Sequence, residues 1–331
     1  MTDENENTQL LATVQKYSKP LLSIVKAVGP FILSQSKLAR ENYENFKLNK
    51  ERLQAISVFL KEESHKLAEE RSKWRGIMYE SSGFARVQAE NNYAMITREL
   101  NKLSTIDKIK DFIGDDEEIN PTNSISDAWI DKFNNLASSL NEEWRKKLLA
   151  KAFANELKKE GSINLSVLNC IGSFDEKTFR YFGILVNNSL RFHGFNIIPH
   201  ESLSLKRLFL VDGRTVSQAS IDFALSHLNL IDTSSRRFLK GEKNKPIYIR
   251  YGRNALELIN NYGEADAAQI EACFFTSLGN SIAQLYEREL TAEGYENFEI
   301  MKLSIQKSLA VGIYDITEQY LSDEEFETLG I

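Results

Sequence analysis

The sequence predicts a mainly α-helical protein, with a long N-terminal helical hairpin followed by a compact helical domain that contains one β-hairpin. Three observations predict this fold class. Proline and glycine are sparse, with 5 and 16 among 331 residues, which disfavours an all-β chain rich in turns. Apolar residues recur at helical spacing along most of the chain. Strand-like segments bounded by turn residues occur together near residue 240. The length predicts two or three packed units.

The first region, residues 1–113, is predicted to be long and helical. From Ser34 to Trp74 there is no glycine or proline. Every seventh residue is apolar, at Ala39, Phe46, Leu53, Leu60, Leu67 and Trp74. A dedicated coiled coil needs a second apolar seam, and this seam is polar, at Lys50, Ser57, Ser64 and Arg71. The pattern therefore favours a long helix that packs on a neighbour. A second helical face resumes after the breakers Ser81, Ser82 and Gly83, which predicts an antiparallel pair.

The single apolar seam of these helices needs a cover. We expect a homo-oligomer or a partner protein to supply it, and burial within the chain is the alternative. The apolar run from Leu21 to Leu33 contains Lys26 and is shorter than the ~20 residues of a transmembrane helix. Its amphipathic pattern favours packing inside the protein, with membrane association as the alternative. The N-terminus lacks the order of a signal peptide, and two cysteines make no disulfide framework, so a cytoplasmic protein is expected.

Turn-forming and acidic residues in GDDEEINPTNS predict a linker at residues 114–125. A compact helical domain is predicted over 126–200. Its first helix has a regular apolar stripe at Trp129, Ile130, Phe133, Leu136, Ala137 and Leu140. Residues 201–331 are predicted to form a helical domain with a basic β-hairpin.

The predicted hairpin joins two extended segments, Arg236 to Leu239 and Ile247 to Tyr251, across a turn rich in glycine, asparagine and proline. A helix that begins near Thr215 precedes it, and a helix followed by a hairpin resembles a winged helix. A hairpin that only covers the helical core is an equal alternative.

The chain has a net charge of -6, yet the segment from Thr233 to Arg253 holds seven cations against Glu242 alone. These cations are the candidate nucleic-acid-binding residues, since phosphate recognition needs clustered positive charge. They are Arg236, Arg237, Lys240, Lys243, Lys245, Arg250 and Arg253. DNA or RNA is therefore a candidate partner. The alternative is a solvated hairpin whose lysines deter edge pairing.

No catalytic residue, metal site or cofactor is predicted. The four histidines lack the spacing of metal ligands. The nucleophile motif GxSxG and the phosphate-binding glycine-rich motifs are missing from the sequence. Enzymatic activity is therefore the minority interpretation.

The stretch LAKAFANELKKEGSINLSVL, Leu149 to Leu168, resembles the signature WAkLLAgEi..PGsfSlrtL of an uncharacterised bacterial helical family. That family resembles the Abi-alpha abortive-infection proteins. The matching residues are Ala150, Lys151, Ala154, Glu156, Gly161, Ser162 and Leu168. The chain departs from the signature at Leu149, Asn155 and Glu160, where the family has Trp, Gly and Pro. Flanking segments are also similar, at Trp129, Ile130 and Phe133, at Phe179 and Phe182, and at Leu278, Gly279 and Leu285.

The resemblance implies a mostly α-helical fold and a setting in bacterial defence against phage, and it carries over no catalytic residue. The expected function is a non-catalytic defence component that binds nucleic acid or a partner protein. A membrane-acting or hydrolytic effector is the alternative. Glu156 is interpreted as a structural group, which either accepts hydrogen bonds from backbone N–H groups beyond Gly161 or pairs with Arg145 or Lys159.

Overall fold

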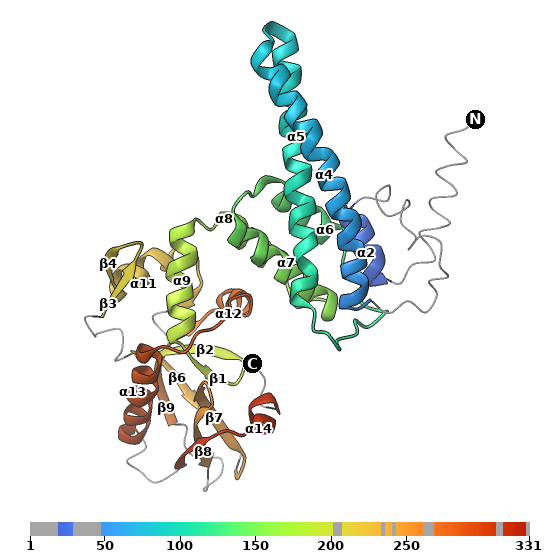
Figure 1. Cartoon of the computed structure of the whole chain (residues 1–331). Helices are drawn as coiled ribbons and strands as arrows, with labels where there is room; N and C mark the ends of the chain where they lie inside the picture. The colour runs from blue at the N-terminus through green and yellow to red at the C-terminus, as the bar shows by residue number, and fades with distance from the viewer. Residues whose placement is uncertain are drawn as a thin grey trace. The chain divides into compact units, whose positions relative to one another are not determined.

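The structure is a computed structural model that describes residues 19–28, 48–200, 207–232, 236–239, 243–260, 268–308 and 314–328 (Figure 1). The chain divides into two compact units, Met1–Ser173 and Phe174–Ile331. The predicted mainly helical character is confirmed, but the second unit contains an antiparallel sheet that is much larger than the one predicted hairpin.

The first unit is built from helices. They are α2 (Lys19–Val28), α4 (Lys50–Glu80), α5 (Gly83–Asp107), the 3-10 helix η2 (Lys108–Phe112), α6 (Asp127–Ser139), α7 (Glu143–Lys158) and α8 (Leu165–Ser173). The pair α4 and α5 is the long antiparallel hairpin that the sequence predicts (Figure 1). Asn49 caps α4, because its side-chain oxygen accepts a hydrogen bond from the Arg52 N–H at 3.1 Å. The part of the predicted helix from Ser34 to Phe46 lies outside the described residues.

In the α4–α5 hairpin, the buried residues of α4 lie near its base, whereas α5 has buried residues further along, at Ala89 and Ile96. The apolar residues of α4 that are buried are Leu53, Ile56 and Leu60. Leu53 and Leu60 belong to the predicted seam, so this part of the seam is covered within the chain. The apolar face of α2 is likewise buried in this unit, at residues that include Leu21, Ile24 and Val25. The described part of that stripe, Lys19–Val28, therefore packs inside the protein.

An aromatic cluster forms the core between α6 and α7. The ring of Phe133 lies 4.8 Å from that of Phe153, edge to face, and the ring of Trp129 lies 5.4 Å from that of Phe153. Such edge-to-face contacts are favourable beyond the area that they bury. The Trp129 Nε1–H donates to the carbonyl of Ile163 at 2.7 Å. This bond ties α6 to the turn between α7 and α8, so the predicted apolar stripe faces the core.

The predicted linker, residues 114–125, lies inside the first unit, whereas the two units divide after Ser173. The Asn123 side chain donates to the carbonyl oxygens of Leu157 and Lys158 at 3.1 and 2.7 Å. The Ile125 N–H donates to the Ser23 Oγ at 3.2 Å. Turn-forming residues therefore make an ordered connection here, because their polar groups satisfy backbone groups of neighbouring elements.

The second unit combines helices with strands. In chain order they are α9 (Glu176–Asn188), β1 (Leu190–Phe192), β2 (Phe195–Pro199), β3 (Leu208–Val211), β4 (Arg214–Ser217), α11 (Gln218–Ser226), β5 (Ile231–Asp232), β6 (Arg236–Leu239), β7 (Pro246–Tyr251), β8 (Asn254–Asn260), β9 (Ala268–Phe275), α12 (Ser277–Ala283), α13 (Ala292–Ser308), β10 (Tyr314–Tyr320) and α14 (Asp323–Thr328). Among the described residues, eight strands form one sheet in the order β10-β8-β7-β1-β2-β9-β5, with β6 also on β9. Strands β3 and β4 form a separate hairpin.

The prediction of a single basic hairpin was wrong. Both predicted strands exist, but β6 pairs with β9, and β7 pairs with β1 and β8. Strands β1, β2 and β9 stand between them in the sheet order. Strand β7 pairs with β8, the next strand in the sequence, because Gly252 and Arg253 form a two-residue loop between them. Gly252 has a φ of +57°, which a glycine at the first position of such a loop readily adopts. The wing of a winged helix is therefore not formed by these two segments.

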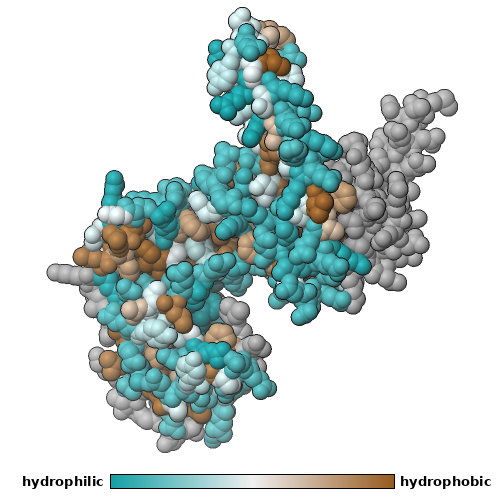
Figure 2. Space-filling view, in the orientation of Figure 1, coloured by the Kyte–Doolittle hydropathy of each residue, from teal (hydrophilic) through white to brown (hydrophobic). Residues whose placement is uncertain are grey.

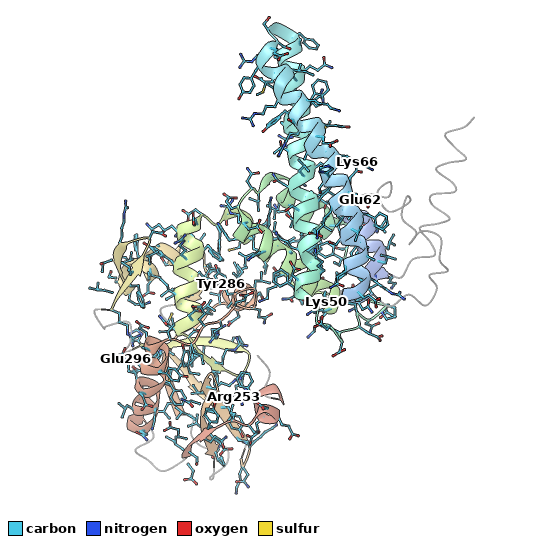
Figure 3. The ribbon with its side chains drawn as sticks, in the orientation of Figure 1. Lys50, Glu62, Lys66, Arg253, Tyr286 and Glu296 are labelled. Atoms are coloured by element: carbon cyan, nitrogen blue, oxygen red, sulfur yellow. The ribbon has the colours of Figure 1, made fainter. Side chains whose placement is uncertain are left out.

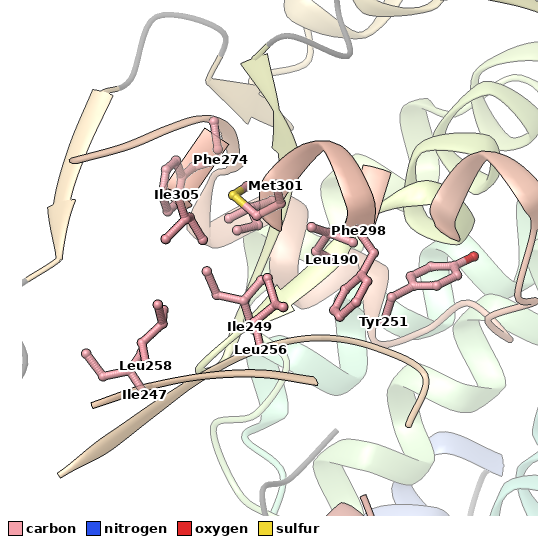
Figure 4. Packing of buried hydrophobic residues seen from close by; sticks show 12 residues of the cluster. Leu190, Ile247, Ile249, Tyr251, Leu256, Leu258, Phe274, Phe298, Met301 and Ile305 are labelled. Carbon is pink, nitrogen blue, oxygen red and sulfur yellow. The ribbon is translucent and has the colours of Figure 1, made fainter. Parts of the chain in front are cut away.

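One face of the sheet packs on α13 and forms the core of this unit (Figure 4). Phe298, Met301 and Ile305 of α13 pack on apolar strand residues such as Leu190 and Ile249. Strand residues alternate between the two faces of a sheet. Residues adjacent to these apolar positions, such as Arg191 and Arg250, therefore lie on the opposite face. That face carries the candidate site.

Candidate functional site

The structure separates the seven predicted nucleic-acid-binding residues. Arg236 and Arg237 lie on β6, with side chains outside the described part of the chain, and Lys240 lies outside it altogether. Lys243 and Lys245 are exposed just before β7. Arg250 lies on β7, and Arg253 lies in the loop that follows it. The predicted set therefore forms no single protruding hairpin.

Arg250 and Arg253 both contact α14. Their guanidinium carbons lie 4.8 and 5.7 Å from the centre of the Phe326 ring, within the range of cation–π contacts. Arg253, which Figure 3 labels, also forms an ion pair with Asp323 of α14. Asp323, Glu324 and Glu325 make the first turn of that helix acidic. A carboxylate of α14, that of Asp323, thus already lies beside the arginine that follows β7.

Arg250 belongs to a row of side chains on the face opposite α13. Its partner across the strand pair β7–β1 is Arg191, and the partner of Arg191 on β2 is Asn196. On the other side, Arg250 stands opposite Ala255 of β8. Residues directly opposite one another on neighbouring strands share a face and lie within ~4.5–5.5 Å at Cβ. The register therefore places two arginines side by side, flanked by a small residue and an amide.

Arg288, which follows α12, completes an arginine cluster with Arg191 and Arg250. Its guanidinium donates to the carbonyl of Ser189 at 2.7 Å, to the Ser189 Oγ at 3.1 Å and to the Oδ1 of Asn196. Asn196 is held in turn by Asn280 of α12, whose Oδ1 accepts from the Asn196 N–H at 2.7 Å and from its Nδ2 at 2.8 Å. This amide chain connects α12 and the arginine cluster to β2.

Two members of the arginine cluster are buried, and no carboxylate of the described residues is paired with the cluster. Arg191 and Arg250 are 8% and 5% exposed. The Nε and Nη2 atoms of Arg191 are buried and have no hydrogen-bond partner in the part of the chain that the structure describes. Among the ion pairs between described residues, none involves Arg191, Arg250 or Arg288. Buried charges are ordinarily paired, because removing an ion from water costs several kcal/mol.

Burial lowers the pKa of Arg191 below the usual value, and the positive charge of Arg250 lowers it further. Burial also lowers the pKa of Arg250. The pKa of Arg288 falls to about 10, first through burial and then through the positive charge of Arg191. All three side chains still carry their proton at neutral pH. Such an arrangement can bind an oxyanion. The anion would balance the positive charge of the arginines, and its oxygens would accept hydrogen bonds from the unpartnered N–H groups of Arg191.

Sequence reasoning identified Arg250 but missed Arg191 and Arg288, which lie outside the basic segment. A signal for Arg191 is present in the sequence. It stands between Leu190 and Phe192, and a cation at an inner position of an apolar strand is unusual. Arg288 has no comparable signal, because its role depends on the packing of α12 and Asn196.

Glu156 has the structural role that the sequence predicts. It is 5% exposed near the end of α7. Its Oε1 accepts from the Gly161 N–H at 2.7 Å, and its Oε2 accepts from the Ile163 N–H at 2.8 Å and from the Ser162 Oγ at 3.3 Å. Gly161 has a φ of +78°, which favours glycine. Glu156 therefore holds the turn between α7 and α8 by accepting from backbone N–H groups.

Two further observations bear on the class of site. Among the residues that the structure describes, no three His, Cys, Asp or Glu side chains gather as metal ligands. No described helix is both long and apolar enough to cross a membrane.

Comparison with protein-family models, with curated proteins and with solved structures finds no match.

Proposed function

We propose that this chain is a non-catalytic binding component of bacterial phage defence, and that its second unit binds nucleic acid through phosphate groups. The setting rests on the sequence resemblance to the abortive-infection type of family. The binding rests on one observation of the structure, which is that Arg191, Arg250 and Arg288 are clustered with no carboxylate of the described residues paired to them.

Phosphate is the anion that suits this cluster. Arginine presents its N–H groups as a planar fork that matches two oxygens of a phosphate. The exposed Lys243 and Lys245, on the approach to β7, add positive charge near the same strand. Lysine and arginine contacts to phosphates supply most of the affinity of sequence-independent binding. No described element is a base-reading helix in a wing, so binding is expected to be largely indifferent to sequence.

Labelled single-stranded and duplex DNA and RNA should bind the full chain at low salt, with an affinity that falls steeply as salt rises. Each phosphate contact contributes about 0.9 to the log–log salt slope on duplex DNA and about 0.7 on a single strand, so four contacts give about -3.6 or -2.8. Fluorescence anisotropy measures both quantities. Lys243→Ala with Lys245→Ala should make the slope shallower, whereas Arg214→Ala, an exposed arginine on β4, should not. Failure of every probe to bind at tens of micromolar would refute the proposal.

Self-association through the α4–α5 hairpin is a second candidate function, and it is favoured by the apolar residues at the tip of the hairpin. Tyr79 and Phe84 are 73% and 82% exposed on either side of the turn at Ser81–Ser82, and Ile77 and Val87 are exposed beside them. Apolar atoms are visible at this tip in Figure 2. Exposed apolar patches of this kind mark protein interaction sites. We propose a second copy of this chain as the occupant, because the two tips would offer each other the same apolar surface.

Light scattering at micromolar concentration should give a mass above 37.9 kDa that decreases on dilution. Tyr79→Ser with Phe84→Ser should restore the monomer mass. Val58→Ser is the matched control, because Val58 is also exposed, at 54%, but lies near the base of α4. Leu53→Asp and Leu60→Asp would not test self-association, because both side chains are buried and their replacement would disrupt the fold. A wild-type protein that is monomeric at every concentration would exclude this candidate.

The alternative of a membrane-acting effector loses its main support. It depended on the apolar stripe from Leu21 to Leu33, and the described part of that stripe is buried in the first unit. No metal-ligand cluster among the described residues favours the hydrolytic alternative.

A further inference from the structure

The charge of the arginine cluster exceeds that of a backbone phosphate. Three guanidinium groups carry three positive charges, and no carboxylate among the described residues is paired with them. An internal phosphodiester of DNA or RNA has one negative charge. A terminal phosphate monoester has about -1.5 to -2 at pH 7, because its second pKa is about 6. The monoester therefore balances the cluster better.

The burial of the cluster also distinguishes these two ligands. Side chains that follow a nucleic-acid backbone are exposed, whereas Arg191 and Arg250 are 8% and 5% exposed. A continuous strand has substituents on both sides of each phosphate, so an internal phosphate reaches these buried side chains less readily than a terminal one. A terminal phosphate has three free oxygens and protrudes from the end of its strand.

The free donors of Arg191 have the geometry that such a group needs. Nε and Nη2 lie on the same edge of the guanidinium plane. Both are buried and have no hydrogen-bond partner among the described residues, so an anion reaches them by displacing what covers them. That edge offers two parallel N–H groups, which bind two oxygens of one phosphate. Arg288 is less available, since three acceptors already occupy it. Arg191 is therefore the principal donor, and Arg250 and Arg288 supply charge.

We infer that the arginine cluster is a site for a terminal phosphate monoester, so that the second unit recognises a phosphorylated end of a nucleic-acid strand. This inference rests on the proposed nucleic-acid binding and names its ligand class. The Phe326 ring lies over Arg250. A phosphate that reaches Arg250 displaces this ring, so Phe326→Ala should tighten the binding of a phosphorylated end.

The test compares one oligonucleotide sequence in three forms, with a phosphate at the 5′ end, at the 3′ end or at neither end. The full chain should bind at least one phosphorylated form about tenfold or more tightly than the unphosphorylated form. Inorganic phosphate should compete with that form, since it supplies the same group. The preference should shrink at pH 5, where the monoester loses its second charge.

Two variants separate a role in binding from a role in structure. Arg191→Lys keeps the positive charge but loses the fork, so it should abolish the preference for the phosphorylated end. Arg214→Lys, on the exposed hairpin strand β4, should retain it. Equal affinity for all three forms would overturn the inference while leaving nucleic-acid binding intact. No binding of any form would overturn the proposed function and this inference together.

Discussion

Replacement of Glu156 by alanine is expected to lower the free energy of unfolding of the first unit by about 2–4 kcal/mol. The Ile163 N–H is buried and would lose its acceptor, and the Gly161 N–H would lose its own. A buried polar group left without a partner costs about 1–3 kcal/mol. The same turn provides the carbonyl that accepts from Trp129 Nε1. The loss should therefore extend to the aromatic core.

Urea denaturation followed by tryptophan fluorescence measures this effect. Glu160→Ala is the matched control. Glu160 lies four residues further on and accepts one long bond, of 3.4 Å, from the exposed Ser124 N–H. Its removal should change the free energy of unfolding by less than about 0.5 kcal/mol. An equal, small effect for both variants would show that Glu156 does not support the turn.

Replacement of Arg191 by methionine is expected to stabilise the second unit in buffer without phosphate, by about 1–4 kcal/mol. The variant removes a buried charge that has no counter-ion among the described residues and relieves its repulsion with Arg250. Methionine fills a similar volume and adapts to irregular surroundings. Residues that serve binding often cost stability in this way.

The midpoint of thermal or urea unfolding measures the gain. Arg214→Met is the control, since Arg214 is exposed on β4 and its replacement should leave the midpoint nearly unchanged. A clear loss of stability in Arg191→Met would mean that Arg191 is a structural arginine with a favourable role in the fold.

The sequence predicted the helical unit better than the sheet unit, and the reason is physical. In α4, α5 and α6, apolar spacing continues over many turns and is interrupted by clear breakers such as Ser81 and Ser82. The stripe that includes Trp129 and Phe133 faces the core as expected. By contrast, β1 and β5 have three and two residues. Such short segments show no periodicity, so their presence depends on tertiary pairing.

The hairpin error has a specific cause. The segment Gly-Glu-Lys-Asn-Lys-Pro resembles a loop between strands, and this suggested that β6 and β7 pair. The sequence indicates a hairpin more strongly at Gly252-Arg253, which forms the two-residue loop between β7 and β8. Glycine at the first position of a short loop is the stronger indication of a hairpin.

The candidate site was only partly predictable. The basic segment contains Arg250, but the feature that makes the site unusual is the pairing of Arg250 with Arg191, about sixty residues earlier in the chain. Strand register brings these residues together, and one sequence does not reveal register between distant strands. Whether a carboxylate of the described residues lies beside these arginines also depends on the packed structure.

The most direct test of the phosphate site is the thermal stability of wild type and Arg191→Met in inorganic phosphate, with ionic strength matched by chloride. A ligand that binds the folded state at one hundred times its Kd stabilises it by about 2.7 kcal/mol. Phosphate should therefore raise the Tm of the wild type more than that of Arg191→Met, beyond the general salting effect that both proteins share. An identical response of the two proteins to phosphate would contradict the account.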